Sequence, residues 1–128
     1  MKKEEIQALI EKQRLYYLSG ETLDVQYRIN ALKTLKTAIL KYEQEIEEAL
    51  KKDLGKSYFE SYMCEVGLSL SEISYMIKHT RSFSKEKRVR TPLAQYVSRS
   101  YTKPSPYGVT LIMSPWNYPF MLTIEPSS

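Results

Sequence analysis

The segment "VTLIMSPWNYPF", residues 109–120, decides the fold class to which the chain is assigned. Its first five residues, 109–113, form a short unbroken apolar run, which is typical of a strand buried on both faces of a parallel sheet. A parallel neighbour needs a crossover of about a dozen residues or more before a second strand. Only residues 114–128 follow, so we expect the chain to be the first, truncated part of a larger α/β protein.

Upstream of this segment, apolar residues recur at steps of three or four, a spacing that predicts amphipathic helices. The first predicted helix covers residues 3–18. The second is capped by Thr22, runs without a break over residues 23–52 and ends at Gly55. Its apolar stripe consists of Val25, Ile29, Leu32, Leu35, Ile39, Tyr42, Ile46 and Leu50.

A third helix is predicted to begin at a capping box formed by Ser57 and Glu60, and to end near Arg81. Gly67 lies inside it, where glycine costs about 1 kcal/mol relative to alanine, so a close approach of another backbone is its expected purpose. Its apolar stripe consists of Phe59, Met63, Val66, Leu70, Ile73 and Ile77.

The chain changes character after the third helix. Residues 82–95, "SFSKEKRVRTPLAQ", form a polar and basic segment that we interpret as a solvated connector. Residues 96–102 are rich in β-forming residues and predict an exposed or edge strand. A turn with two prolines and a glycine then leads into the apolar run 109–113. The expected fold is therefore α/β: N-terminal helices followed by the first strands of a sheet.

The composition excludes several classes of protein. Hydrophobic residues make up 42% of the chain and charged residues 27%, which is a soluble, globular balance. The net charge of +4 is spread over helices that carry both signs, so we predict no nucleic-acid partner. No apolar run approaches the ~20 residues that span a bilayer. The N-terminus carries acids where a secretory signal is apolar, and one cysteine allows no internal disulfide, so we expect a cytoplasmic protein.

The lone cysteine and the lone histidine suggest little chemistry by themselves. Cys64 lies in the middle of a predicted helix with no base at a useful spacing, so we interpret it as a structural cysteine. His79 lies near a helix end, where its charge suits the helix dipole. We predict no metal site from so few ligands.

Chemistry is concentrated in the loop that follows the apolar run. Ligands of open α/β sheets bind just past the carboxyl ends of the strands, and residues 114–118 occupy that place. Pro115 and Pro119 restrict the backbone on both sides of Asn117. A carboxamide held on a stiff loop can stabilise an oxyanion. The alternative is that Asn117 only satisfies the backbone of the turn, as asparagine often does.

The segment "PYGVTLIMSPWNYPFMLTIEP", residues 106–126, resembles the start of the cofactor domain of the NAD(P)-dependent aldehyde dehydrogenases. The segments "RINALKTLKTAILKYEQEIEEALKKDLGKS" and "SEISYMIKHTRSFSKEKRVRTPL" are similar to the second helix, the third helix and the connector of that family. The details resemble the class 3, fatty- and aromatic-aldehyde branch. The resemblance implies a helical part of a Rossmann-like cofactor domain at 1–93, an oligomerisation-arm strand at 94–104, and the first buried strand with the catalytic loop at 105–128.

The resemblance also implies roles for individual residues. Asn117 matches the asparagine whose side-chain amide holds the substrate oxygen as it becomes an oxyanion. Ser114, Pro115 and Trp116 match residues lining the nicotinamide side of the cofactor cleft, and Tyr118 matches an aromatic wall of the aldehyde tunnel. In that family a cysteine thiolate attacks the aldehyde, hydride passes to NAD or NADP, and water releases the acid.

The chain departs from the family's pattern by lacking three of its motifs. The nucleophile in a Gly-Gln-x-Cys context, the base in Glu-Leu-Gly-Gly and the cofactor turn Gly-x-Thr-x-x-Gly do not occur in these 128 residues. We therefore expect the N-terminal part of an enzyme that oxidises medium- or long-chain or aromatic aldehydes with NAD or NADP as a homo-oligomer, and we expect this chain to be inactive alone. The alternative is a non-catalytic helical module that associates with itself.

Overall fold

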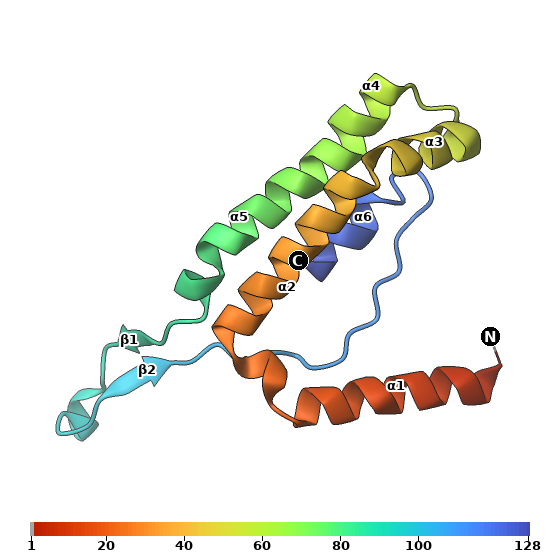
Figure 1. Cartoon of the computed structure of the whole chain (residues 1–128). Coiled ribbons are helices and arrows are strands. Elements are labelled where there is room, and N and C mark those ends of the chain that lie inside the picture. The colour runs from red at the N-terminus through yellow and green to blue at the C-terminus, as the bar shows by residue number, and fades with distance from the viewer. Residues whose placement is uncertain (1) are drawn as a thin grey trace.

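The computed structural model of the chain describes residues 2–128. Two long helices, α2 (Val25–Lys41) and α5 (Gly67–Phe83), lie side by side and run in opposite directions (Figure 1). Helix α1 (Lys3–Leu18) lies apart from this pair, has the predicted bounds and contains no buried residue (Figure 1). None of the described helices is long and apolar enough to cross a membrane.

The core lies between α2 and α5, on the faces that the apolar stripes predicted. It is formed by Leu32, Ile39, Val66, Leu70 and Ile73. Ile73 and Val66 have no exposed surface. Phe120 and Ile124, near the end of the chain, are partly buried against this cluster. The last segment of the chain is therefore held against the helix pair by apolar contacts as well as by hydrogen bonds.

The cap of the second predicted helix differs from expectation. Thr22 lies in a 3₁₀ turn, Glu21–Leu23, and Asp24 is the N-cap of α2. The two carboxylate oxygens of Asp24 accept hydrogen bonds from the N–H groups of Gln26 and Tyr27, at 3.0 and 3.1 Å. A carboxylate that satisfies two free N–H groups at once makes the better cap, so the helix begins later than predicted.

The same predicted helix is broken in two at Tyr42, which adopts φ −105° and ψ 16°. Helix α3 (Glu43–Leu54) starts at the next residue and points in a different direction from α2 (Figure 1). The prediction of one continuous helix was therefore wrong. The sequence did not reveal the break because neither glycine nor proline lies at it. Gly55 ends α3 with φ 70°, as predicted for a left-handed C-terminal stop.

The third predicted helix is confirmed as α4 (Tyr58–Ser61), a π-helical turn (Tyr62–Val66) and α5 in succession. Ser57 is the N-cap, and its hydroxyl accepts a hydrogen bond from the Glu60 N–H at 3.1 Å. The Gly67 N–H donates to the Tyr62 carbonyl, five residues earlier, which closes the π turn. A Cβ atom at Gly67 would lie 2.9 Å from that carbonyl oxygen. The glycine thus allows a close backbone approach within its own helix.

The π turn also changes which side chains face the core. A π turn takes one residue more than an α turn, so the apolar stripe does not continue through it on one face. Phe59 and Met63, which precede the end of the turn, are 76% and 52% exposed, contrary to the predicted stripe. The side chains without exposed surface in this region are Ser61, Glu65, Val66 and Ser69.

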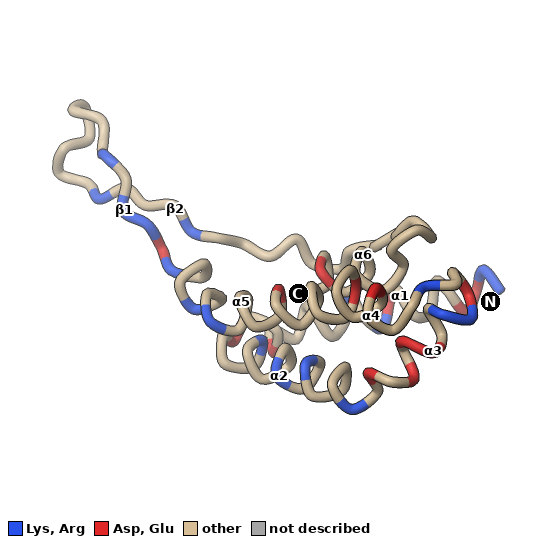
Figure 2. The backbone as a smooth tube through the Cα atoms, turned by 90° about the horizontal axis from the view of Figure 1, so that it is seen from above, with Lys and Arg blue, Asp and Glu red and all other residues tan. Residues whose placement is uncertain are grey.

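Strands β1 (Lys87–Val89) and β2 (Ser100–Thr102) form an antiparallel pair in which Arg88 lies opposite Tyr101. Figure 2 shows this hairpin extending away from the helices, with basic residues along and beside it. The predicted strand at 96–102 is confirmed only over its last three residues. The residues before them, 96–99, continue the 3₁₀ turn at Leu93–Gln95 as turn and irregular chain. The segment predicted to be a connector supplies the partner strand β1.

The predicted buried strand at 109–113 is absent from the described residues. The segment runs as irregular chain, and Leu111 and Met113 are 83% and 84% exposed. A strand is held by hydrogen bonds to a neighbouring strand, and no strand of the described residues lies beside this segment. The structure is mostly helical with a small two-stranded sheet, so the parallel sheet of the predicted α/β class is not seen in it.

Candidate functional site

Residues 114–120 form a loop that ends in a short helix, α6 (Met121–Ile124). The Leu122 N–H donates to the Tyr118 carbonyl at 3.1 Å, so helical hydrogen bonding begins in the loop itself. Pro119 lies in this first turn, where a missing N–H removes no helical hydrogen bond. The proline is therefore compatible with the start of the helix at this point.

A chain of hydroxyl groups ties the two ends of the loop together. The Thr123 hydroxyl, on α6, donates to the Pro119 carbonyl at 2.6 Å. The Ser114 Oγ lies 2.7 Å from the Thr123 Oγ1. Because the Thr123 proton is used on Pro119, the Ser114 hydroxyl is the donor in this second bond. Ser114, predicted to line a cofactor cleft, here connects the start of the loop to α6.

A buried ion pair between Lys56 and Glu65 lies against the loop. Lys56 comes from the segment between α3 and α4 and is 8% exposed, whereas Glu65 comes from the π turn and has no exposed surface. Two charges so far from solvent are tolerated when they are paired and hydrogen-bonded. Removing one partner of such a pair costs about 3–5 kcal/mol, because the other charge stays buried.

Both members of the pair also bind the loop. The Lys56 Nζ donates to the Asn117 backbone carbonyl at 3.0 Å and lies 4.1 Å from the centre of the Tyr118 ring. The second carboxylate oxygen of Glu65 accepts from the N–H groups of Phe120 and Met121, at 2.8 and 3.3 Å. These N–H groups lie at the start of α6, where backbone N–H groups have no acceptor within the helix.

Asn117 is exposed, and its backbone is held while its side chain is not. The carbonyl is bound by Lys56, but the Asn117 carboxamide makes no hydrogen bond to any described residue. The interpretation that the carboxamide only satisfies the turn requires a side-chain bond to nearby backbone, and no such bond is seen among residues 2–128. The amide N–H groups are available to another acceptor.

The neighbouring residues form an open, largely apolar surface. Trp116 is 84% exposed, and Pro115 is exposed beside it. Both rings are exposed apolar surface, and the sequence contains no Gly-x-Thr-x-x-Gly turn for the phosphates of a dinucleotide. The Tyr118 ring, predicted as a tunnel wall, has the Lys56 ammonium group over its face.

The sequence interpretation did not find Lys56 and Glu65. Lys56 lies between a helix-ending glycine and the Ser57 cap, a position at which a lysine side chain is expected to be exposed to solvent. Glu65 falls off the apolar stripe of a regular helix and reaches the core because of the π turn. The one available signal was Gly67, whose unfavourable position inside a helix indicated an irregularity two residues after Glu65.

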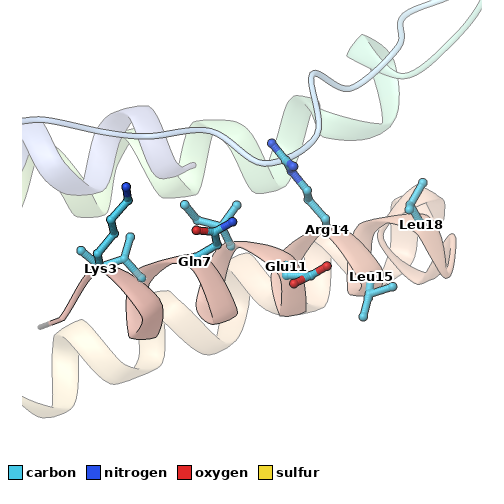
Figure 3. Close-up of a pocket in the computed structure, with 8 residues that line it drawn as sticks. Lys3, Gln7, Glu11, Arg14, Leu15 and Leu18 are labelled. Atoms are coloured by element: carbon cyan, nitrogen blue, oxygen red, sulfur yellow. The ribbon is translucent and has the colours of Figure 1, made fainter.

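The other candidate groups add no second site. Cys64 is a free, partly buried thiol in the π turn. No group of three or more His, Cys, Asp or Glu side chains in residues 2–128 is placed to hold a metal ion. The pocket drawn in Figure 3 is lined by eight residues of α1 alone, all of them exposed, so it is the open side of one helix.

Comparison with known proteins decides the family. The sequence model described as "Aldehyde dehydrogenase family" matches residues 1–127. The chain belongs to the aldehyde dehydrogenase family. It is homologous to family 3 members over the N-terminal quarter of their chains. Enzymes of the family depend on NAD or NADP.

Individual relatives agree with this assignment. The chain is 42% identical over 113 residues to a 4,4'-diaponeurosporen-aldehyde dehydrogenase of Staphylococcus aureus, covering 88% of this chain and 25% of the relative. It is 37% identical over 122 residues to a dimeric NADP-preferring aldehyde dehydrogenase of Canis lupus familiaris, covering 94% and 27%. The chain therefore spans about a quarter of the length of these relatives.

A solved structure matches the fold as well. The substrate-bound state of Staphylococcus aureus AldH superimposes with a TM-score of 0.91 at 38% identity, covering 99% of this chain and 27% of that one. The arrangement of helices, hairpin and loop described above is thus the arrangement of the corresponding part of an aldehyde dehydrogenase.

Proposed function

We propose that this chain is the N-terminal part of a class 3-type aldehyde dehydrogenase and supplies the oxyanion donor of its active site. The enzyme oxidises medium- or long-chain or aromatic aldehydes to carboxylic acids with NAD or NADP. The observation that carries the proposal is the state of Asn117: its carbonyl is held by Lys56, while its carboxamide is exposed and unbonded to residues 2–128. A donor held ready in this way suits a charge that forms only during the reaction.

In this reaction the Asn117 amide donates a hydrogen bond to the aldehyde oxygen as negative charge develops on that atom. The amide is neutral, and Lys56 already holds the backbone that carries it, so the backbone needs no reorganisation when the charge appears. Ser114, Pro115 and Trp116 would hold the nicotinamide of NAD or NADP, which accepts hydride when bound. Tyr118 completes the wall on the aldehyde side.

The rest of the active site lies outside these 128 residues. Cys64 sits in the π turn, on the same turn as the Glu65 carboxylate, and has no histidine or other base bonded to it among the described residues. A thiolate nucleophile needs a cation or a base beside it. We therefore propose that the nucleophile and the general base come from the part of the enzyme that follows this segment.

We also propose that the parent enzyme is a homo-oligomer. The β1–β2 hairpin extends from the helices (Figure 2), and no further strand of residues 2–128 pairs with either of its outer edges, a form suited to pairing with another chain. One relative is named a dimeric enzyme. The alternative function is a non-catalytic helical module that associates with itself. The exposed apolar side chains of residues 109–113 favour such self-association.

A chimeric enzyme separates the two functions. This chain replaces the corresponding 27% of Staphylococcus aureus AldH, to which it is 38% identical. If the chain carries the proposed part of the active site, the chimera reduces NAD or NADP in the presence of an aliphatic aldehyde. A folded, soluble chimera without activity would support the non-catalytic module.

A further inference from the structure

We propose that Lys56 and Glu65 are positioning residues for the oxidation of aldehyde, which act by fixing the backbone on both sides of the Asn117 carboxamide. Neither side chain reaches the substrate in this proposal. The proposal rests on the proposed function in one respect only: holding Asn117 in place is taken to stabilise the oxyanion.

The contacts of the pair bracket the loop. The Lys56 Nζ holds the Asn117 carbonyl at 3.0 Å, and the Glu65 carboxylate holds the Phe120 and Met121 N–H groups at 2.8 and 3.3 Å. The loop is therefore fixed at the oxyanion residue and again three residues later. The two anchors are joined to each other by the ion pair itself, so they cannot move independently.

Three features indicate that the ion pair holds the loop in place. Glu65 is delivered to the core by the π turn, which needs the glycine at position 67. The Lys56 ammonium group is bonded to the Glu65 carboxylate and the Asn117 carbonyl, and the Tyr118 ring lies beside it. The second carboxylate oxygen of Glu65 is used entirely on the start of α6. Apart from the bond that joins the pair, every hydrogen bond of these two side chains among residues 2–128 goes to the loop or to α6.

A buried ion pair is not needed for stability alone. Neutral or apolar groups of similar size often give a fold of equal stability, whereas removal of one charge leaves the other buried and unpaired. A double substitution therefore separates stability from positioning. Lys56→Met together with Glu65→Gln removes both charges. The glutamine carbonyl introduced at position 65 still accepts from Phe120 and Met121, but the lysine that donates to the Asn117 carbonyl is gone.

In the chimera with Staphylococcus aureus AldH, Lys56→Met alone should lower the melting temperature, and the double variant should recover most of that loss. The turnover number of the double variant should nevertheless fall by about 10- to 100-fold, since a misplacement of ~1 Å costs about that much. The KM for aldehyde should stay within about threefold, because the group affected acts on the developing charge.

The matched control uses Lys33 on α2 and Glu48 on α3, two exposed side chains with no hydrogen bond to the loop among the described residues. Lys33→Met together with Glu48→Gln makes the same chemical change at solvent-exposed positions. It should alter neither turnover nor melting temperature measurably.

A second readout uses the 128-residue chain itself and needs no activity. In ¹⁵N relaxation, the Asn117 N–H should have an order parameter near ~0.85 in the unchanged chain and below ~0.6 in the double variant. The Met121 N–H should stay rigid in both. An unchanged order parameter at Asn117 overturns the proposal, whatever the chimera does.

The two readouts also separate this proposal from the proposed function. If the double variant of the chimera melts like the parent and keeps full turnover, the positioning role is overturned. If Asn117→Ala is equally harmless in that chimera, the oxyanion role itself has failed. Should the double variant not fold, Lys56→Gln together with Glu65→Gln decides: it removes both charges, and the side chain at position 56 is then one bond too short for the contact that the lysine makes with Asn117. Wild-type turnover of that variant overturns the proposal.

Discussion

The Lys56 ammonium group lies 3.0 Å from the backbone carbonyl oxygen of Asn117, although 61 residues separate the two in the chain. This bond joins the start of the third helical segment to the loop that carries the candidate oxyanion donor. It leaves the Asn117 carboxamide free of described partners, so the carboxamide position depends on the backbone that Lys56 holds. The same ammonium group lies over the Tyr118 ring at 4.1 Å.

The contact between Lys56 and Tyr118 gives the first prediction. Tyr118→Leu should lower the free energy of unfolding of this chain by about 1–2 kcal/mol, because a partly desolvated cation loses the face of the ring. Tyr118→Phe keeps the ring and should be within ~0.5 kcal/mol of the unchanged chain. Urea denaturation followed by circular dichroism measures both. Equal loss in the two variants would show that the hydroxyl, and not the ring face, stabilises the loop.

The second prediction concerns the π turn. Helix propensity alone predicts that Gly67→Ala stabilises the chain by about 1 kcal/mol. The structure predicts the opposite sign, a loss of about 1–3 kcal/mol, because the added Cβ would lie 2.9 Å from the Tyr62 carbonyl oxygen. Ser71→Ala, at an exposed position of the same helix, is the matched control. A more stable Gly67→Ala variant would contradict the account of how Glu65 reaches the core.

The third prediction concerns association. Leu111 and Met113 are more than four-fifths exposed, at 83% and 84%, and belong to an apolar segment without a strand partner among residues 2–128. We expect the 128-residue chain to self-associate, and Leu111→Lys with Met113→Lys to shift it toward monomer in light scattering. Two lysines placed at the exposed Ser71 and Ser82 control for added charge. A chain that is monomeric at millimolar concentration would contradict the prediction.

The fourth prediction is that the 128-residue chain alone forms no NADH or NADPH from an aldehyde. Cys64 is the only thiol, it is partly buried in the π turn, and no base is bonded to it among the described residues. Absorbance at the wavelength of the reduced cofactor measures the rate, with the active chimera as positive control. Activity that disappears in Cys64→Ser would overturn the assignment of the nucleophile to another part of the enzyme.

Helix positions were predictable from the sequence because they depend on local spacing. The first helix has its predicted bounds, and most of the apolar positions of α2 and α5 are buried as expected. The break at Tyr42 and the π turn were not predictable in this way, because no glycine or proline lies at Tyr42 and a period of 3.6 residues is assumed throughout. The error at the π turn hid Glu65, which a regular helix would place off the core stripe.

The loop was singled out correctly as unusual, but the residues that hold it were not. Proline spacing and the position of Asn117 are local features, whereas the contacts from Lys56 and Glu65 depend on tertiary packing over 55 and more residues. The strand at 109–113 failed as a prediction for a related reason. An apolar run becomes a strand only when neighbouring strands bind it, and residues 2–128 contain none beside it.

The roles of the individual loop residues stay predictions. Asn117 is assigned to the oxyanion, Ser114, Pro115 and Trp116 to the nicotinamide side, and Tyr118 to the aldehyde side. The two alternatives for Asn117, an oxyanion donor or a turn residue, differ most in the effect that a substitution should have on turnover.

The measurement that tests the central claim most directly is the turnover of Asn117→Ala in the chimera with Staphylococcus aureus AldH. Loss of one oxyanion donor should lower turnover by about 100- to 1000-fold, or ~3–4 kcal/mol, with a melting temperature close to that of the parent. Asn117→Asp should be at least as harmful, since it puts a carboxylate where negative charge must form. Asn30→Ala, at the other asparagine of the chain, should leave turnover unchanged. An Asn117→Ala chimera that turns over like its parent and loses only ~1 kcal/mol of stability would make Asn117 a turn residue and contradict the account.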